Sequence, residues 1–107
     1  MKGTNLGEFE ELALLIVGVL ADDAYGAAVI QELELRTGRN PSVGAVHSAL
    51  NRLIDKGFIK SEYGAASEVR RGRRKIFYKL TPAGETALIR TRELRNRLFD
   101  LIPKLSS

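Results

Sequence analysis

The period of the hydrophobic pattern changes at Gly57, and this change limits the fold more than any other feature of the sequence. Before Gly57, apolar residues recur at helical spacing in three segments: 5–20, 25–36 and 42–56. After it, two segments carry β-branched and aromatic residues in partial alternation, as the strands of a hairpin do: 58–63 and 75–80. Helical spacing then returns in a last helix, for which Thr81 is the predicted N-cap and which continues to about Ile102. The pattern predicts an α+β, mainly α chain in the order helix, helix, helix, hairpin, helix.

Chain length and residue types exclude several classes of protein. A chain of 107 residues has room for one domain, so a second, catalytic domain is excluded. With no cysteine and one histidine, the chain lacks the ligands of thiolate and His-rich metal sites, and we expect no metal and no cofactor. The longest apolar run is shorter than a membrane span, and the first residues do not resemble a signal peptide. We therefore expect a cytoplasmic protein without a membrane partner.

Charge is segregated along the chain. Residues 1–35 carry one basic and seven acidic side chains, whereas residues 36–80 carry eleven basic and three acidic ones. The formal net charge of +4 does not show this division. Because a basic surface attracts polyanions, the second segment is the one expected to bind nucleic acid.

The third predicted helix has one apolar stripe and one face of small and polar residues. Ser42 is the favoured N-cap, and Gly57 is the left-handed residue that ends the helix. The residues expected in the buried stripe follow helical spacing: Val43, Val46, Leu50, Leu53 and Ile54. The residues expected to be exposed form the opposite face: Gly44, Ala45, His47, Ser48, Asn51, Arg52 and Asp55.

Two supporting helices, this third helix and a hairpin with a basic tip make the winged variant of the helix-turn-helix, here residues 1–81. The third helix fits the major groove of B-DNA, where Asn51 could read adenine and Arg52 could read guanine or bind a phosphate. The link from Gly64 to Arg74 is too charged to be buried and could follow the DNA backbone or the minor groove. The predicted DNA-binding residues are Tyr25, Ser42, Gly44, Ala45, His47, Ser48, Asn51, Arg52, Lys60, Arg70, Arg71, Arg73, Arg74 and Lys75.

The last helix and the first helix both carry more apolar surface than one small domain covers. Along the last helix, the spacing of apolar residues alternates between four and three, as in a coiled coil, with Thr91 as the polar member. The first helix, with Asn5 as its predicted N-cap and Glu8 as its capping partner, is apolar nearly all round. We therefore expect segment 82–107, in the same compact unit as residues 1–81, to be a dimerisation helix. The predicted homodimer interface is Leu12, Leu15, Ile16, Val19, Ala87, Thr91, Leu94, Leu98, Phe99, Leu101 and Ile102.

Several short stretches together resemble one family in residues and in order: 6–12, 23–26, 42–53, 56–57, 71–75 and 78–84. In these the chain resembles the PadR family of bacterial and archaeal transcriptional regulators, in its short, single-domain subgroup. The resemblance implies a homodimer whose C-terminal helices pack on the partner. It also implies, in the usual case, a repressor that a small molecule or another signal releases from double-stranded DNA. The family usually has tyrosine where this chain has His47, so a pH-sensitive contact can arise there.

A binding module and an enzyme are the alternative function classes. A winged helix can also serve as a protein-interaction module or as a non-specific nucleic-acid-binding module, whose affinity for DNA carries no sequence preference. An enzyme is disfavoured because Asp22 and Asp23 suit a helix cap better than an acid pair, and Gly72 is not followed by a helix. The operator, the regulated genes and the choice between repressor and activator have no signal in the sequence.

Overall fold

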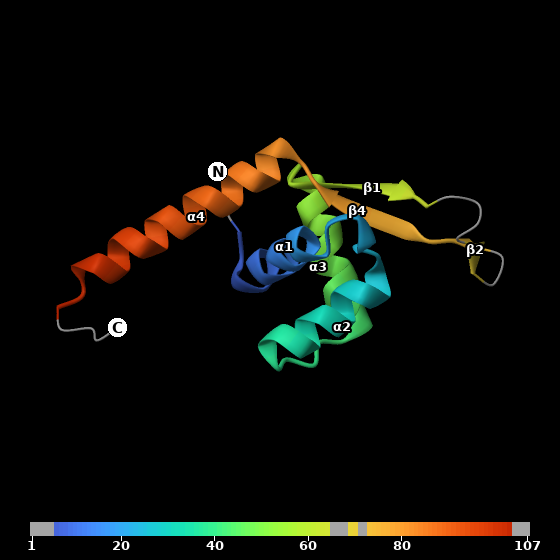
Figure 1. Cartoon of the computed structure of the whole chain (residues 1–107), viewed down its shortest axis with the longest axis horizontal. Helices are drawn as coiled ribbons and strands as arrows, with labels where there is room; N and C mark the ends of the chain where they lie inside the picture. The colour runs from blue at the N-terminus through green and yellow to red at the C-terminus, as the bar shows by residue number, and fades with distance from the viewer. Residues whose placement is uncertain (1–5, 65–68, 71–72, 104–107) are drawn as a thin grey trace.

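The computed structural model describes residues 6–64, 69–70 and 73–103 and shows the predicted order of elements (Figure 1). The helices are α1 (Glu8–Leu20), the short 3-10 helix η1 (Ala21–Asp23), α2 (Gly26–Thr37), α3 (Val43–Asp55) and α4 (Pro82–Leu101). The strands are β1 (Ile59–Tyr63), β2 (Val69–Arg70), β3 (Arg73–Arg74) and β4 (Ile76–Leu80). The predicted architecture, mainly helical with a hairpin between α3 and α4, is confirmed.

Helices α1, α2 and α3 form the body of the molecule, from which the hairpin and α4 extend in opposite directions (Figure 1). The molecule is accordingly elongated, at 56 × 29 × 22 Å. Gly84 is the one buried residue of α4. Most of the surface of α4 therefore has no neighbour among the described residues.

Helix α1 is capped differently from the prediction. Its N-cap is Gly7, whose backbone N–H donates to Oε1 of Glu10 at 3.2 Å. The capping carboxylate must lie three residues after the N-cap, so Glu10 takes the place predicted for Glu8. Asn5 lies outside the described residues.

The segment between α1 and α2 pairs with the hairpin, which the sequence pattern did not indicate. Asp22 and Asp23 lie in η1 and are not the N-cap of α2, a position that Tyr25 occupies in an extended conformation. Tyr25 forms an isolated antiparallel bridge with Phe77, and the N–H of Tyr78 donates to the carbonyl of Ala24 at 2.8 Å. Because the hairpin holds Tyr25 extended, α2 begins after it.

Helix α3 is capped by Ser42, as predicted, through a hydrogen bond from the N–H of Ala45 at 3.0 Å. The buried residues of α3 are Val46, Ala49, Leu50 and Leu53. The prediction that Val43 is buried is wrong, since 59% of it is exposed. The buried arc is centred between Val46 and Leu53, which leaves Val43 at its edge and includes Ala49.

Strands β1 and β4 form the predicted hairpin, in antiparallel register from Ile59 opposite Leu80 to Tyr63 opposite Ile76. The link between them was predicted to be a loop, but β2 and β3 pair within it, with Val69 opposite Arg74. The hairpin therefore continues into a second short ladder rather than ending at Tyr63.

The start of α4 packs directly on the connection between α3 and β1. Thr81 is the predicted N-cap and accepts from the N–H of Gly84 at 3.0 Å. Its hydroxyl donates to the carbonyl of Gly57 at 2.6 Å, and its N–H donates to the carbonyl of Phe58 at 3.1 Å. A Cβ atom added at Gly84 would lie 2.1 Å from the oxygen of Phe58. Only glycine allows this close approach.

The hydrophobic core lies between the three body helices and the base of the hairpin. Its buried members are Ala13, Leu14, Ile16, Val17, Ala24, Val29, Leu33, Val46, Ala49, Leu50, Leu53, Phe58, Ile59 and Tyr78. The core fixes one side of α3 and leaves the other side at the surface.

Candidate nucleic-acid interface

The face of α3 predicted to contact DNA is exposed along its whole length. It comprises Gly44, Ala45, His47, Ser48, Asn51, Arg52 and Asp55. A Cβ atom added at Gly44 would meet nothing within 4 Å, so the backbone there is open to a close approach. Side chains near the start of this face are small, and those further along carry donors and acceptors.

A buried carboxylate on α1 binds one flank of α3. Glu10 is 7% exposed and accepts from Nε of Arg52 at 2.7 Å and from Nζ of Lys56 at 2.5 Å. Burial alone would raise the pKa of Glu10, but hydrogen bonds from Lys56, Arg52 and the N–H of Gly7 outweigh it and lower that pKa. Since Nε of Arg52 is bound to Glu10, Arg52 has only the outer part of its guanidinium free for DNA.

The start of α2 lies against the other flank of α3. A Cβ atom added at Gly26 would come within 3.7 Å of Cε1 of His47, so the imidazole packs beside the first residue of α2. The ring of Tyr25 meets that of Phe77 edge-on, with centroids 5.6 Å apart, and Nζ of Lys75 lies 4.2 Å from the centroid of Tyr25. The exposed face of α3, the start of α2 and the base of the hairpin therefore form one continuous surface.

The basic residues of the hairpin lie along and beyond this base. Lys60 is exposed and lies opposite Lys79, whose Nζ pairs with Oε1 of Glu62 at 3.4 Å and with Oδ1 of Asp22 at 3.7 Å. Arg70, Arg73 and Arg74 belong to β2 and β3, at the end of the hairpin away from the body (Figure 1), and Arg71 lies outside the described residues.

Some of the predicted dimer residues are exposed, and others are packed within their own chain. The large apolar side chains exposed on α1 and at the end of α4 are Leu15, Val19, Leu94, Leu98, Phe99, Leu101 and Ile102. Leu12, Ala87 and Thr91 are half-buried. Ile16 is 5% exposed and belongs to the core of its own chain, because it lies on the inner side of α1 with Ala13 and Val17. Ile16 is therefore not available to a partner.

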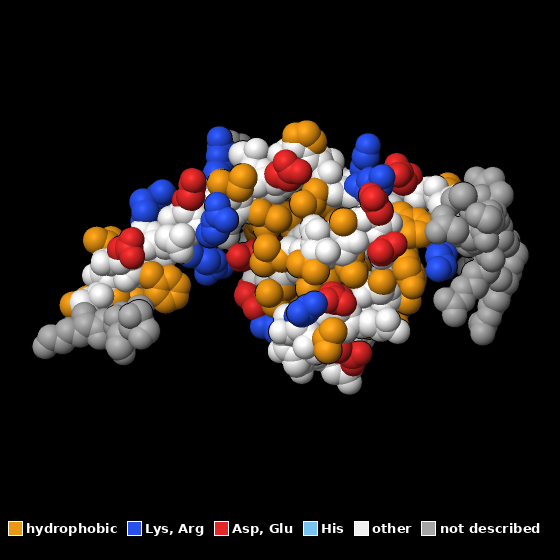
Figure 2. Space-filling model, viewed as in Figure 1, with side chains coloured by type: hydrophobic (Ala, Val, Ile, Leu, Met, Phe, Trp, Pro, Cys, Tyr) orange, Lys and Arg blue, Asp and Glu red, His pale blue; other side chains and the backbone are white. Residues whose placement is uncertain are grey.

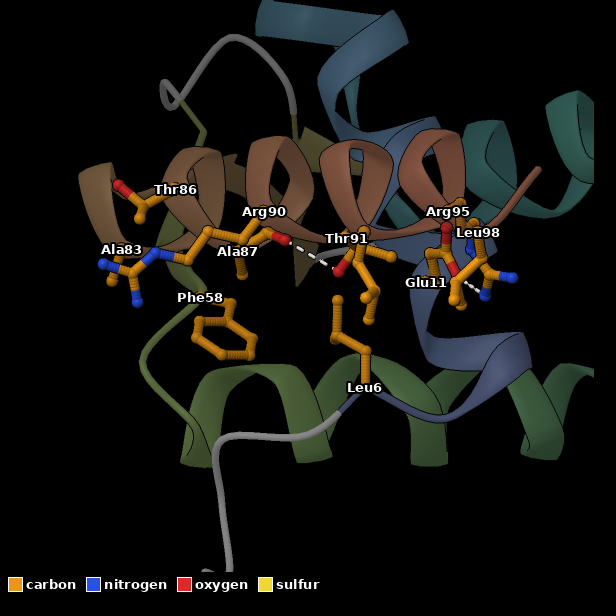
Figure 3. Close-up of a pocket in the computed structure, with 11 residues that line it drawn as sticks. Leu6, Glu11, Phe58, Ala83, Thr86, Ala87, Arg90, Thr91, Arg95 and Leu98 are labelled. Carbon is orange, nitrogen blue, oxygen red and sulfur yellow. Dashed lines mark hydrogen bonds and ion pairs between the residues drawn. The ribbon is translucent and has the colours of Figure 1, made fainter. Parts of the chain in front are cut away.

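Two grooves follow α4 and both reach the ion pair between Arg95 and Glu11, whose Nη2 and Oε1 atoms lie 2.7 Å apart. The larger groove, about 790 Å³, has Phe58 and Leu6 across from the Ala87 and Thr91 side of α4 (Figure 3). The other groove, about 470 Å³, includes Leu15, Leu88, Ile89 and Phe99 in its lining. Apolar side chains also gather over α1 and at the far end of α4 in the space-filling view (Figure 2).

Residues 16–90 match the family model described as the transcriptional regulator PadR-like family. The chain belongs to the PadR-like family of transcriptional regulators. No curated protein sequence matches it. The matched residues of this PadR-like regulator include α2, α3, the hairpin and the start of α4, so they cover the continuous surface of α3, α2 and the hairpin. The first half of α1 and the second half of α4 lie outside the match.

Solved structures of transcription regulators share the fold. A PadR family transcription regulator from Clostridium difficile is 27% identical, with a TM-score of 0.68 over 84% of this chain and 92% of that one. The hsRosR protein of the hsRosR-S4 complex is 26% identical, with a TM-score of 0.72 over 94% and 79% of the two chains. A transcriptional regulator from Clostridium thermocellum, 23% identical, has the same fold, with a TM-score of 0.69 over 92% and 89%. The family model and the two clostridial structures are described as transcriptional regulators.

The described part of this PadR-like chain has neither a metal-binding cluster nor a membrane-spanning helix. Among the described residues, no cluster of histidine, aspartate and glutamate side chains could bind a metal ion. The described part of the chain likewise contains no helix of sufficient length and hydropathy to cross a membrane.

The sequence pattern did not indicate that Glu10 binds α3. The contacts of Glu10 with Arg52 and Lys56 join residues 42 and 46 positions apart. No periodic pattern reports contacts at that separation. The first turn of α1 has three glutamates, of which one is buried. To identify the buried glutamate, one must know which side of α1 faces the core, and the sequence does not show this.

Proposed function

We propose that this PadR-like regulator binds a palindromic operator as a homodimer in the cytoplasm, as a repressor that a small molecule or another signal releases. The observation that carries the proposal is the continuous surface that joins the open face of α3 to the start of α2 and the basic hairpin. A helix is about 10–12 Å across, and the major groove of B-DNA is about 12 Å wide. α3 can therefore enter the groove while the hairpin follows the adjacent backbone.

The residues on α3 take different roles in such a complex. Gly44 and Ala45, with no bulk beyond Cβ, allow the helix start to lie close to phosphates or base edges. Asn51 presents an amide, the group that pairs with the N6 and N7 edge of adenine. Arg52 is directed by Glu10, so of its two predicted roles a phosphate contact through its outer nitrogens suits it better than reading guanine.

The homodimer is supported by the exposure of α4. Leu94, Leu98 and Phe99 are each about half exposed on a helix that extends away from its own body (Figure 1). A second copy that covers these side chains and the two grooves would remove this apolar surface from water. Two-fold symmetry would then place two α3 helices about 34 Å apart, in successive major grooves of one face of the DNA.

The test of the proposed function is selection of bound duplexes from a random pool at near-physiological salt. A palindromic consensus is the expected result. Enrichment without any consensus would favour the non-specific nucleic-acid module, and absence of DNA binding would favour a protein-interaction module.

Replacing Asn51 by alanine should weaken binding to the consensus by roughly 1–3 kcal/mol and relax the preference at one base position of each half-site. The matched control is Arg73→Ala with Arg74→Ala, which should weaken binding to all sequences and lower the dependence of affinity on salt. Titrations of both variants with the consensus and its single-base variants, at two salt concentrations, separate the effects. A uniform loss across all bases for Asn51→Ala would contradict its role in base reading.

Replacing Leu98 by aspartate should give a folded monomer, because a charge placed at the centre of the proposed interface would be desolvated by the partner. Leu98 is absent from the core, so the chain should keep its helical circular dichroism. Leu35→Asp is the control, since Leu35 is 73% exposed on α2, away from α4, and should not change the sedimentation coefficient. A Leu98→Asp protein that still sediments as a dimer would place the interface elsewhere.

A further inference from the structure

The first turn of α1 binds three other parts of the fold through three glutamates. Both oxygens of Glu8 accept from the guanidinium of Arg39, between α2 and α3, at 2.6 and 3.0 Å. The second glutamate, Glu10, binds Arg52 and Lys56 of the α3 end, as described above. The third glutamate, Glu11, accepts through Oε1 from Nη2 of Arg95 on α4 at 2.7 Å. One helical turn is thus bonded both to the proposed recognition helix and to the proposed dimerisation helix.

The bond to α4 lies where that helix has few other contacts. The first turn of α4 is fixed by Thr81 and Gly84, but from Arg92 onward every described residue is exposed. Arg95 lies about three turns beyond the fixed end, and its guanidinium reaches back to Glu11 on α1, as Figure 3 shows at one end of the groove. The ion pair therefore ties the free half of α4 to the body.

The same ion pair lies on the surface proposed to meet the partner. Arg95 and Glu11 line both grooves, and the apolar neighbours in these grooves include Leu15, Leu94 and Leu98. In one chain Arg95 is half exposed, and water and salt weaken the pair. A partner packed over the grooves would exclude water from it, which strengthens the attraction between the two charges.

We propose that the Arg95–Glu11 ion pair determines the half-site spacing that the dimer accepts, by fixing the angle of α4 against the winged helix. This inference rests on the proposed function, because it requires both a homodimer through α4 and a two-part operator. A tilt of about 10° at one end of a helix about 30 Å long moves the other end by about 5 Å, more than the roughly 3.4 Å rise of one base pair. A small change in the angle of α4 would therefore shift the register of the two α3 helices by more than one base pair. Arg95 is a positioning residue, which acts on DNA through α4.

The experiment compares wild type with Arg95→Gln on duplexes that carry the selected half-site at spacings varied one base pair at a time. Wild type should favour one spacing over its neighbours by about tenfold. Arg95→Gln should reduce that ratio to about threefold or less, with the same base preference within each half-site and the same sedimentation coefficient. The charge swap Glu11→Arg with Arg95→Glu should restore the sharp preference, a rescue that a merely structural loss would not show.

Arg97→Gln is the matched control, because Arg97 is on the same helix and lines neither groove. It should keep the wild-type spacing preference. The inference is overturned if Arg95→Gln keeps the wild-type ratio, or if it weakens binding equally at every spacing. A wild-type protein that is monomeric, or that binds all spacings alike, would instead refute the proposed dimer on a two-part operator.

Discussion

Replacing Glu10 by alanine should lower the free energy of unfolding at pH 7 by about 3 kcal/mol. Glu10 is the buried charged residue of the described chain, and it neutralises Arg52 and Lys56 while it accepts the N–H of Gly7. Removal of the carboxylate takes one ion-pair partner from Arg52 and one from Lys56, whose side chain is 16% exposed. Breaking one side of a buried ion pair is costly because the remaining charge stays desolvated. Urea unfolding at one fixed protomer concentration measures the loss.

Glu8→Ala is the matched control for Glu10. Glu8 is also in the first turn of α1 and also binds an arginine, but its side chain is 63% exposed and that of Arg39 is 45% exposed. An exposed pair contributes between zero and about 1 kcal/mol, so Glu8→Ala should stay within about 1 kcal/mol of wild type. Equal losses of unfolding free energy for Glu8→Ala and Glu10→Ala would show that the burial of Glu10 does not determine the size of the loss.

The lowered pKa of Glu10 predicts how the free energy of unfolding changes as the pH falls. The pKa of Glu10 is lowered from its ordinary value of 4.5, so the folded state favours the carboxylate. Stability from Glu10 is fully present above pH 4.5 and is lost as the pH falls through the lower, folded-state pKa. The difference in unfolding free energy between wild type and Glu10→Gln should therefore shrink below pH 4.5. A difference that stays constant from pH 7 to pH 3 would exclude a titrating ion pair.

Local signals in the sequence predicted the elements of this chain well. Ser42 and Thr81 cap the helices they were expected to cap, and Gly57 has the positive φ of 79° that a helix end requires. These features depend on residues within one turn of each other. The exposed face of α3 was also predictable, because the side of a helix opposite a single apolar stripe lies at the surface.

Features set by contacts between distant segments were not predictable in the same way. Tyr25 was expected to begin α2 or to contact DNA, and its bridge to Phe77 depends on a residue 52 positions later. Ile16 was assigned to the dimer because α1 is apolar all round, and composition alone does not tell the inner side from the outer. Arg52 was treated as free for DNA for the same reason, since its partner Glu10 lies on another helix. In each case the hydrophobic period predicted the helix or strand, whereas the contacts of the residue depend on how the helices and strands pack together.

Replacing Gly84 by alanine should cost about 3 kcal/mol of unfolding free energy, although alanine is the better helix former. The added Cβ atom would lie 2.1 Å from the oxygen of Phe58, a backbone atom that no rotamer change can move. The first turn of α4 would have to shift, which would break the bonds of Thr81 to Gly57 and to Phe58. Since α4 is also the proposed dimerisation helix, the variant should dimerise more weakly as well.

Gly44→Ala is the opposite case and the matched control. Gly44 is also helical, but an added Cβ atom there would meet nothing within 4 Å, so the helix should gain about 0.5–1 kcal/mol. The same added methyl group stands on the face proposed to approach DNA, and operator affinity should fall while stability rises. Thermal unfolding of both variants together with operator titration of Gly44→Ala measures these opposed effects. A Gly84→Ala protein as stable as wild type would show that α4 does not begin against Phe58, because a backbone contact that close leaves no room for a methyl group.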